Sequence, residues 1–362
     1  MKNRLDPIRV IVVEDSPTVR TMIMAILQEH SDFQVIGTAT NGEDAIRITH
    51  RMKPDIITMD VNMPKMDGLE ATKRIMSEIP TPIVVVSASL MQSEVDLSFD
   101  ALQAGALTAI KTPGVNDPKA CQEFAQVVRT MANVPVVRRW DRNSNNGSKP
   151  KPVSVELTIP TLRRSQKQSI EVIGIASSTG GPGVLAAILK KLPEDFPIPI
   201  LIVQHITQGF GTGFANWLDG EVALKVRLAQ YGDTPTPGTI LLAPDDRHMQ
   251  LNNLGLVELI VDQPYRGIRP SANYLFRSFA RYYGPSAMGI VLTGMGDDGA
   301  AGLEEMHQTG SVNIAQEEKS CIVYGMPREA ILRQAIDFVL TPDQIASMLA
   351  QLIYNNTKGA KE

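Results

Sequence analysis

The sequence predicts two doubly wound α/β domains. Both halves of the 362-residue chain alternate short β-rich runs with helical stretches, which is the pattern of parallel sheets covered by helices. A polar segment without an apolar period separates the halves. The length is about that of two typical domains. Hydrophobic residues make up 43% and charged residues 20% of the chain, as is typical of globular proteins.

The first half is expected to form a parallel sheet of five strands. The strands lie at residues 8–13, 33–39, 55–60, 82–88 and 106–110. Helices are expected after Pro17, after Gly42, after Gly68, around Ser93 and over residues 117–131. Ligands of doubly wound sheets bind outside the carboxyl ends of the strands. Those ends carry Glu14, Asp15, Asp60 and Ser87, which are therefore candidate site residues.

Residues 131–168 are expected to form a linker between a first domain at 8–130 and a second at 169–356. The segment is rich in Asn, Pro and Ser, which break regular structure. It is also basic. The charge favours a soluble, flexible connection, and a hinge that touches an acidic surface of this protein or of a partner is the second interpretation.

The second half is also expected to be α/β, with a mainly parallel sheet and some antiparallel strand in addition. Strands are expected at 171–177, 199–205, 239–244, 247–251, 256–261, 287–294 and 311–315. Helices are expected at 184–192, 209–218 and 272–283, after Asp298, and near 327–334 and 342–354. The two halves show no clear self-similarity, so no internal repeat is predicted.

Composition excludes several function classes. The formal net charge of -4 gives no chain-wide reason to expect nucleic acid as a partner. No stretch approaches about 18 uninterrupted apolar residues, so membrane insertion is not expected. The N-terminus lacks a signal-peptide pattern. Two cysteines, Cys121 and Cys321, are too few for a disulfide framework or a cysteine metal site, and they fit a reducing cytoplasm best.

The acidic strand ends of the first half predict a divalent cation site. Hard carboxylate oxygens suit Mg²⁺, which takes one or two carboxylates and keeps several waters. Asp60 would be the phosphoryl acceptor, and the cation would neutralise charge during transfer. The Ser87 hydroxyl could donate to a phosphoryl oxygen. A single acidic residue is usually a loop cap, but three that converge by topology make that interpretation weaker.

In sequence this half resembles response-regulator receivers. The resemblance rests on the pair Glu14-Asp15, the block MDVNMPKMDGLEA at 59–71 and VSA at 86–88, in the family's order. It implies a flavodoxin-like fold in which Glu14 and Asp15 hold Mg²⁺ and Asp60 is phosphorylated. It also implies that the backbone carbonyl of Asn62 completes the metal site.

The resemblance has one departure, in the segment AIKTPG at 109–114. Receivers carry Lys-Pro after the fifth strand, with the Lys against the phosphoryl group, whereas here Lys111 stands one residue early and Thr112 precedes Pro113. A one-residue slip turns a side chain to the other face of a strand, unless a local bulge restores it. The aromatic switch residue of the family is also replaced, by Ala109. Coupling between phosphorylation and output is therefore open.

Three strand-end groups of the second half have the residue types of a serine hydrolase. The loop SSTGGPG at 177–183 stands between a strand and a helix, where glycines allow close approach and helix amides bind negative charge. His205 ends the next strand, and Asp297 and Asp298 follow a later one. Taken singly these would be a phosphate loop or helix cap, a core histidine and an N-cap. Together they supply nucleophile, base and orienting acid.

The second half resembles the catalytic domain of chemotaxis protein-glutamate methylesterases, the CheB family. The matching motifs are STGG (178–181), QH (204–205), APDDRHM (243–249), RPS (269–271), LTGMGDDGAAG (292–302) and YGMPREA (324–330). Carried over by position, Ser178 is the nucleophile, His205 the base and Asp298 the orienting acid, while the Met295 amide belongs to the oxyanion hole. The receiver in front matches the same family.

The resemblance implies a phosphorylation-regulated enzyme of chemotactic adaptation. Its substrates would be methylated glutamates, and also glutamines, on methyl-accepting chemotaxis receptors, and a chemotaxis histidine kinase would be the phosphodonor. The hydrolase half would need no cofactor. Three other functions compete with this one: a hydrolase for another ester or amide, a scaffold with an inactive hydrolase fold, and a DNA-binding regulator. The motif set, the intact triad and the lack of a basic recognition helix disfavour them in turn.

Overall fold

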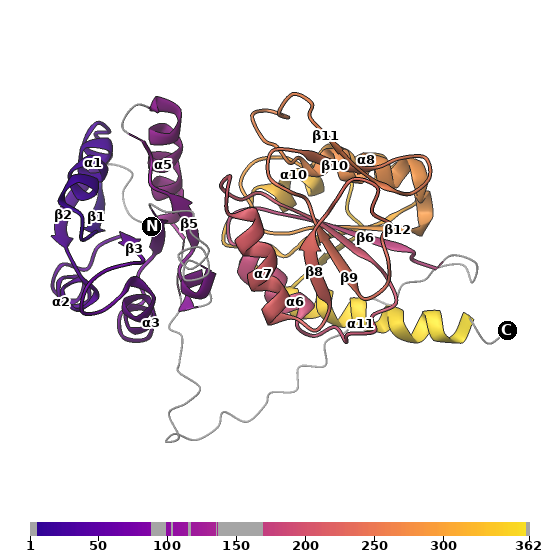
Figure 1. Ribbon diagram of the computed structural model, residues 1–362, viewed down its shortest axis with the longest axis horizontal. Helices are drawn as coiled ribbons and strands as arrows, with labels where there is room; N and C mark the ends of the chain where they lie inside the picture. The colour runs from indigo at the N-terminus through magenta and orange to yellow at the C-terminus, as the bar shows by residue number, and fades with distance from the viewer. Residues whose placement is uncertain are drawn as a thin grey trace, which may run out of the picture. The chain divides into compact units, whose positions relative to one another are not determined.

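The computed structural model describes residues 6–87, 99–102, 104–114, 117–134, 136 and 169–359, the last seven of these by their backbone alone. The chain divides into two compact units, residues 1–152 and 153–362, each of which is described by itself (Figure 1). None of the described helices is long and apolar enough to cross a bilayer.

The first unit contains the expected five-stranded parallel sheet. Its strands are β1 (Ile8–Val13), β2 (Phe33–Ala39), β3 (Ile56–Asp60), β4 (Ile83–Ser87) and β5 (Thr108–Lys111). The order is β2-β1-β3-β4-β5, with every neighbouring pair parallel. The order reverses between β1 and β3, and ligands of doubly wound sheets bind at that reversal. The expected helix around Ser93 lies outside the described residues.

Four helices of this unit begin at side-chain caps. They are α1 (Pro17–Gln28), α2 (Gly42–Met52), α3 (Gly68–Glu78) and α5 (Pro118–Met131). The capping side chains of Ser16, Asn41, Asp67 and Asp117 each accept a hydrogen bond from the amide three residues on. Such caps satisfy amides that the first turn leaves without partners. Helices α1 and α5 cover one face of the sheet, and α2 and α3 the other (Figure 1).

The second unit is built on a seven-stranded sheet in which every neighbouring pair is parallel. The order is β14-β13-β12-β6-β7-β9-β8. The strands are β6 (Val172–Ser177), β7 (Ile200–Gln204), β8 (Lys225–Leu228), β9 (Thr239–Leu242), β12 (Ala287–Val291), β13 (Val312–Gln316) and β14 (Phe338–Leu340). Every residue of β6, β7, β12 and β13 is buried, as expected of strands covered on both faces.

Helices cover both faces of this sheet. They are α6 (Gly181–Leu189), α7 (Gly211–Glu221), α8 (Ala272–Tyr282), α9 (Ala300–Gln308), α10 (Met326–Leu332) and α11 (Pro342–Gly359). Helices α6, α7 and α11 lie on one face, and α8, α9 and α10 on the other (Figure 1). The expected antiparallel strands are β10 (His248–Leu251) and β11 (Val257–Ile260), which pair with each other. Strands β8 and β14 were not predicted.

The strand order fixes where a ligand site can form. From the central strand β6 the chain moves to β7 on one side and later to β12 on the other. Strands β6 and β12 are neighbours, and the loops after them lead to α6 and α9 on opposite faces, so their carboxyl ends lie where doubly wound sheets bind ligands. Ser178 follows β6 and Asp298 follows β12, so the topology brings the two loops together.

Candidate functional site

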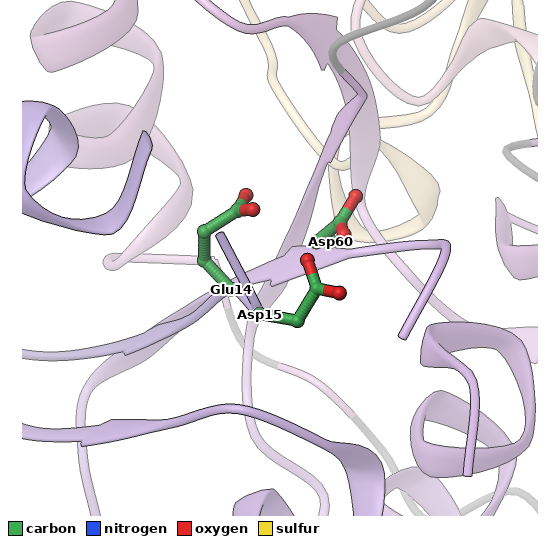
Figure 2. Close-up of side chains that lie close together, drawn as sticks. All are labelled: Glu14, Asp15 and Asp60. Atoms are coloured by element: carbon green, nitrogen blue, oxygen red, sulfur yellow. The ribbon is translucent and has the colours of Figure 1, made fainter. Parts of the chain in front are cut away.

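The acidic strand ends of the first unit do converge. Glu14 and Asp15 follow β1, and Asp60 ends β3, the strand paired with β1. One carboxylate oxygen of each residue lies within 4.8 Å of the others. Figure 2 shows the three side chains together at this edge of the sheet.

Electrostatics favour a cation at this cluster. Glu14 is only 4% exposed. Burial, together with the charge of Asp60, raises the pKa of Glu14 to about 7. A divalent cation among the three groups would offset their repulsion and favour the charged form of Glu14. The donors are all hard oxygens, which is the set that Mg²⁺ prefers, so the residues present fit this ion.

Backbone contacts hold Asp60 in place. The Gly68 amide donates to the Val61 carbonyl at 2.9 Å, which closes the loop after β3. A Cβ at Gly68 would collide with the Asp60 carbonyl oxygen, so a larger residue at this position would displace Asp60. The Val61 amide donates to Asp60 Oδ1 at 2.8 Å, which orients the carboxylate.

The remaining receiver residues lie at the same edge. Asn62 is exposed in the loop two residues after Asp60. Ser87 is buried and pairs in register with Lys111. The pairing runs from Thr108 to Lys111 without a shift, so no bulge precedes Lys111, whose side chain is exposed. The Oγ1 of Thr112 is buried without a hydrogen-bond partner in the part of the chain that the structure describes.

Replacing Asp15 by Asn is expected to weaken Mg²⁺ binding by more than about tenfold, because loss of even an outer-shell partner of a metal costs roughly 10- to 100-fold. Isothermal titration of the full chain with MgCl₂ measures the affinity. Glu123→Gln is the matched control, since that carboxylate is 66% exposed and pairs with Lys119 on its own helix. Unchanged affinity in Asp15→Asn, or equal weakening in Glu123→Gln, would contradict the site.

In the second unit the serine loop is anchored by neighbouring strands. Ser177 ends β6, and the Ser178 amide donates to the Thr293 carbonyl at 3.0 Å. The Gly181 amide donates to the Ser178 carbonyl at 2.8 Å, where α6 begins. A Cβ at Gly294 would lie 2.7 Å from the Cβ of Ser178. Ser178 therefore packs directly against the loop that follows β12.

His205 lies beside this loop and contacts an acid. Its amide donates to the Ser177 carbonyl at 2.8 Å. Its ring Nε2 is 2.8 Å from Asp298 Oδ2, and the two side chains are 11% and 1% exposed. The contact leaves Nδ1 as the ring nitrogen available to Ser178. No hydrogen bond joins Ser178 to the ring among the described contacts, and such bonds are often long before substrate binds.

Asp298 is fully buried and accepts several hydrogen bonds at the start of α8. The donors are Ser271 Oγ at 2.5 Å, the Ala272 amide at 2.6 Å and Asn273 Nδ2 at 2.7 Å. Burial alone would raise the pKa of Asp298, but the His205 contact and the Ser271 and Ala272 donors outweigh it and hold that pKa below its usual range. The helix N-terminus also favours the negative charge. Asp298 is therefore an anion throughout the neutral pH range.

The neighbouring Asp297 has a different environment. Its carboxylate forms an ion pair with Arg266, whose side chain is largely exposed. Thus the structure brings Asp298, and not Asp297, to His205.

The loop after β12 carries Met295. The Gly294 carbonyl accepts from the amides of Gly325 and Met326, at 3.1 and 3.0 Å. The Thr293 hydroxyl donates to the Thr179 carbonyl at 2.9 Å, which links this loop to the serine loop. The Met295 amide has no acceptor among the described residues. It is therefore available to a developing oxyanion.

Sequence reasoning missed three side chains that contact this site. Ser271 and Asn273 bind Asp298, and Gln204 contacts the serine loop. Gln204 and Ser271 stand in the motifs QH and RPS, which gave them no role, and Ser271 also precedes an apolar helix, as N-cap residues do. His248, which also lies beside Ser271, has a structural role. Its Nδ1 accepts from the Ser271 amide at 3.0 Å, and its ring stacks on Tyr274.

Two family models match the chain. The model for CheB methylesterase matches residues 173–349, and the model for the response regulator receiver domain matches residues 10–117. Among solved structures, the crystal structure of the Thermotoga maritima CheB methylesterase catalytic domain is similar at 35% identity, with a TM-score of 0.49 over 51% of this chain and 99% of that one.

Curated relatives match nearly the whole chain. Protein-glutamate methylesterase/protein-glutamine glutaminase 1 of Syntrophus aciditrophicus is 45% identical over 95% of this chain and 98% of that protein. Protein-glutamate methylesterase/protein-glutamine glutaminase of Nitrosospira multiformis is 45% identical over 96% of this chain and 97% of that protein. Identity of this level over both halves shows that the chain belongs to the CheB family of protein-glutamate methylesterases, with a response regulator receiver domain in front of the methylesterase domain.

Proposed function

We propose that this protein is a phosphorylation-regulated serine hydrolase that removes methyl esters from glutamate side chains of methyl-accepting chemotaxis receptors. The observation that carries the proposal is the hydrogen bond between His205 and the fully buried Asp298, beside the serine loop. An acid held in this way fixes the ring of a general base and stabilises its protonated form. The relatives named methylesterase and glutaminase support the substrate class.

The proposed reaction proceeds through an acyl-enzyme. His205 Nδ1 takes the proton of Ser178 as the serine oxygen attacks the ester carbonyl carbon. The oxyanion that forms accepts from the Met295 amide. The bond to the methoxy group then breaks, and His205 gives its proton to the departing methanol. A water molecule, deprotonated by His205, attacks the acyl carbonyl carbon. The bond to the Ser178 oxygen then breaks, His205 returns the proton to that oxygen, and the glutamic acid formed loses its proton to solvent.

The same residues would deamidate receptor glutamines. The acyl-enzyme is identical, and the leaving group is ammonia, which takes the proton from His205 in the place of methanol. Apart from the substrate and water, each step of either reaction uses only groups of the chain itself. We therefore propose glutaminase activity at the same site, without a cofactor for the hydrolase.

Regulation is proposed to begin at Asp60, phosphorylated by a chemotaxis histidine kinase. Glu14, Asp15, Asp60 and the Asn62 carbonyl would hold Mg²⁺, which would neutralise charge during phosphoryl transfer. Ser87 and Lys111 are the proposed contacts of the phosphoryl group. We assign the receiver to residues 8–130, a linker to 131–168 and the catalytic domain to 169–356. Both cysteines are free, which supports a cytoplasmic location.

The proposal is tested by methanol release from methylated receptor membranes. We expect the full chain to release methanol, and the rate to rise when Mg²⁺ and a small phosphodonor such as acetyl phosphate are added. Asp60→Asn removes the acceptor oxygen and is expected to remove that rise. A chain that releases no methanol would contradict the esterase, and an undiminished rise in Asp60→Asn would contradict the acceptor.

A further inference from the structure

The Gln204 side chain bonds to the backbone carbonyls of both Ser178 and His205 and has no role in the reaction described above. Gln204 is the last residue of β7, directly before His205, and is 5% exposed. Its partner in register on the neighbouring strand is Ser177, directly before Ser178. The residues that precede the nucleophile and the base are thus opposite each other across two central strands.

The side-chain amide of Gln204 takes part in three hydrogen bonds. Its Nε2 donates to the Ser178 carbonyl at 2.9 Å and to the His205 carbonyl at 2.7 Å. Its Oε1 accepts from the Ser177 hydroxyl at 2.6 Å. The orientation of the amide is determined chemically, because carbonyl oxygens can only accept and therefore require the NH₂ group. Ser177 must then be the donor, which fixes its hydroxyl as well.

These contacts tie the backbone of Ser178 to the backbone of His205. The Ser178 carbonyl also accepts from the Gly181 amide, and the His205 amide donates to the Ser177 carbonyl at 2.8 Å. One carboxamide thereby completes a closed set of bonds around the nucleophile and the base. A rotation of either backbone unit would leave a buried donor or acceptor without its partner, which is unfavourable.

Gly181 is small because this network fills its space. A Cβ at that position would overlap Gln204 Oε1 and would lie 2.8 Å from Ser177 Oγ. The backbone of Gly181 is in the helical region and needs no glycine for conformational reasons. The second glycine of the STGG motif, Gly181, is thus explained by its close approach to the Gln204–Ser177 pair.

We propose that Gln204 is a positioning residue for the hydrolase, anchored by Ser177, which sets the distance and angle between the Ser178 hydroxyl and His205 Nδ1. The inference rests on the proposed roles of Ser178 and His205. It goes beyond them because it assigns a function to the two side chains that hold those groups. A misplacement of about 1 Å between reacting groups can lower a rate by about 10²-fold.

The test compares kcat with KM. In methanol release, Gln204→Met, which keeps the volume but loses the bonds, is expected to lower kcat by about tenfold or more, with KM changed less than about threefold, because no substrate contact is removed. Ser177→Ala and Gly181→Ala disturb the same network from its other sides and are expected to lower kcat in the same way. Modification of Ser178 by a small sulfonyl fluoride should slow in parallel.

Asn313→Leu is the matched control. Asn313 is also a fully buried carboxamide, and its Nδ2 also donates to two carbonyls, those of Leu303 and Ala335, but it contacts no residue of the triad. We expect it to lower stability to urea and to leave kcat of the folded enzyme unchanged. If Gln204→Met does not fold, Ser177→Ala and Gly181→Ala decide the result.

Three results would overturn the inference: a kcat within about twofold of wild type in Gln204→Met, a loss of kcat equalled by Asn313→Leu, or a change in KM alone. A wild-type chain that is modified at Ser178 but releases no methanol would contradict the substrate class. The modification rates of the variants would still test Gln204 in that case.

Discussion

Replacing Ser178 by Ala is expected to lower methanol release by about 10³-fold or more, because it removes the hydroxyl that forms the acyl-enzyme. The serine lies where β6 ends, against Gly294 of the opposite loop and beside His205. The loss should appear in kcat with KM nearly unchanged, since the substitution removes a single hydroxyl group and leaves the rest of the loop in place. The measurement is initial-rate methanol release from methylated receptor membranes.

Ser177 provides the comparison, because it is the adjacent serine in the same loop. Its hydroxyl donates to Gln204 and is fully buried, so it cannot reach a substrate. Ser177→Ala should therefore lose activity only to the extent that the loop is displaced, about tens of fold at most. A larger loss of activity in Ser177→Ala than in Ser178→Ala would show that Ser178 is not the nucleophile. A sulfonyl fluoride should label the wild type at Ser178 and leave Ser178→Ala unlabelled.

The fold could be predicted because its strands are apolar and long enough to be recognised. Strands β6, β7, β12 and β13 are five or six residues long, mostly apolar and buried throughout, as expected of strands in a sheet that is covered on both faces. The two missed strands, β8 and β14, are at the edges of the sheet. Strand β8 has four residues, two of which are cationic, and β14 has three. Both are too short for a periodicity to be recognised.

The candidate site was predicted as far as its strand ends. Ser178, His205 and Asp298 all follow central strands, and the rule for parallel sheets is sufficient to place them at one edge. The residues that hold them were not predictable in this way. Ser271 and Asn273 reach Asp298 from the start of α8, 27 and 25 residues away in sequence. Such contacts depend on how a helix docks on a sheet, which local patterns do not encode.

The receiver illustrates the same limit. The sequence located the three carboxylates, since each follows β1 or ends β3. It left open whether a bulge brings Lys111 toward the acceptor, because bulges depend on strand pairing. The continuous register of β4 and β5 settles that point of geometry, and it leaves Ser87 and Lys111 opposite each other at the ends of their strands.

Replacing Asp298 by Asn is expected to lower kcat for methanol release by about 10³-fold or more and to destabilise the catalytic domain. The carboxylate accepts from Ser271, Ala272, Asn273 and the His205 ring, and an amide offers only one oxygen in return. Its NH₂ group would face buried donors, each of which costs about 1–3 kcal/mol when left without a partner. Activity and urea unfolding of the same samples measure the two effects.

Asp297→Asn separates this role from a general effect of acidity in the loop. Asp297 forms an exposed pair with Arg266, and exposed ion pairs contribute only about 0–1 kcal/mol, so we expect little change in the free energy of unfolding and less than about a threefold change in kcat.

The pH dependence of stability gives a second test of Asp298. The folded-state pKa of Asp298 lies below the ordinary value of 3.8, so its stabilisation is present above that value and is lost as the pH falls through the folded-state pKa. The stability difference between wild type and Asp298→Asn should therefore narrow below about pH 4. Equal losses in the two variants, or a difference that does not narrow in acid, would contradict Asp298 as the charged partner of His205.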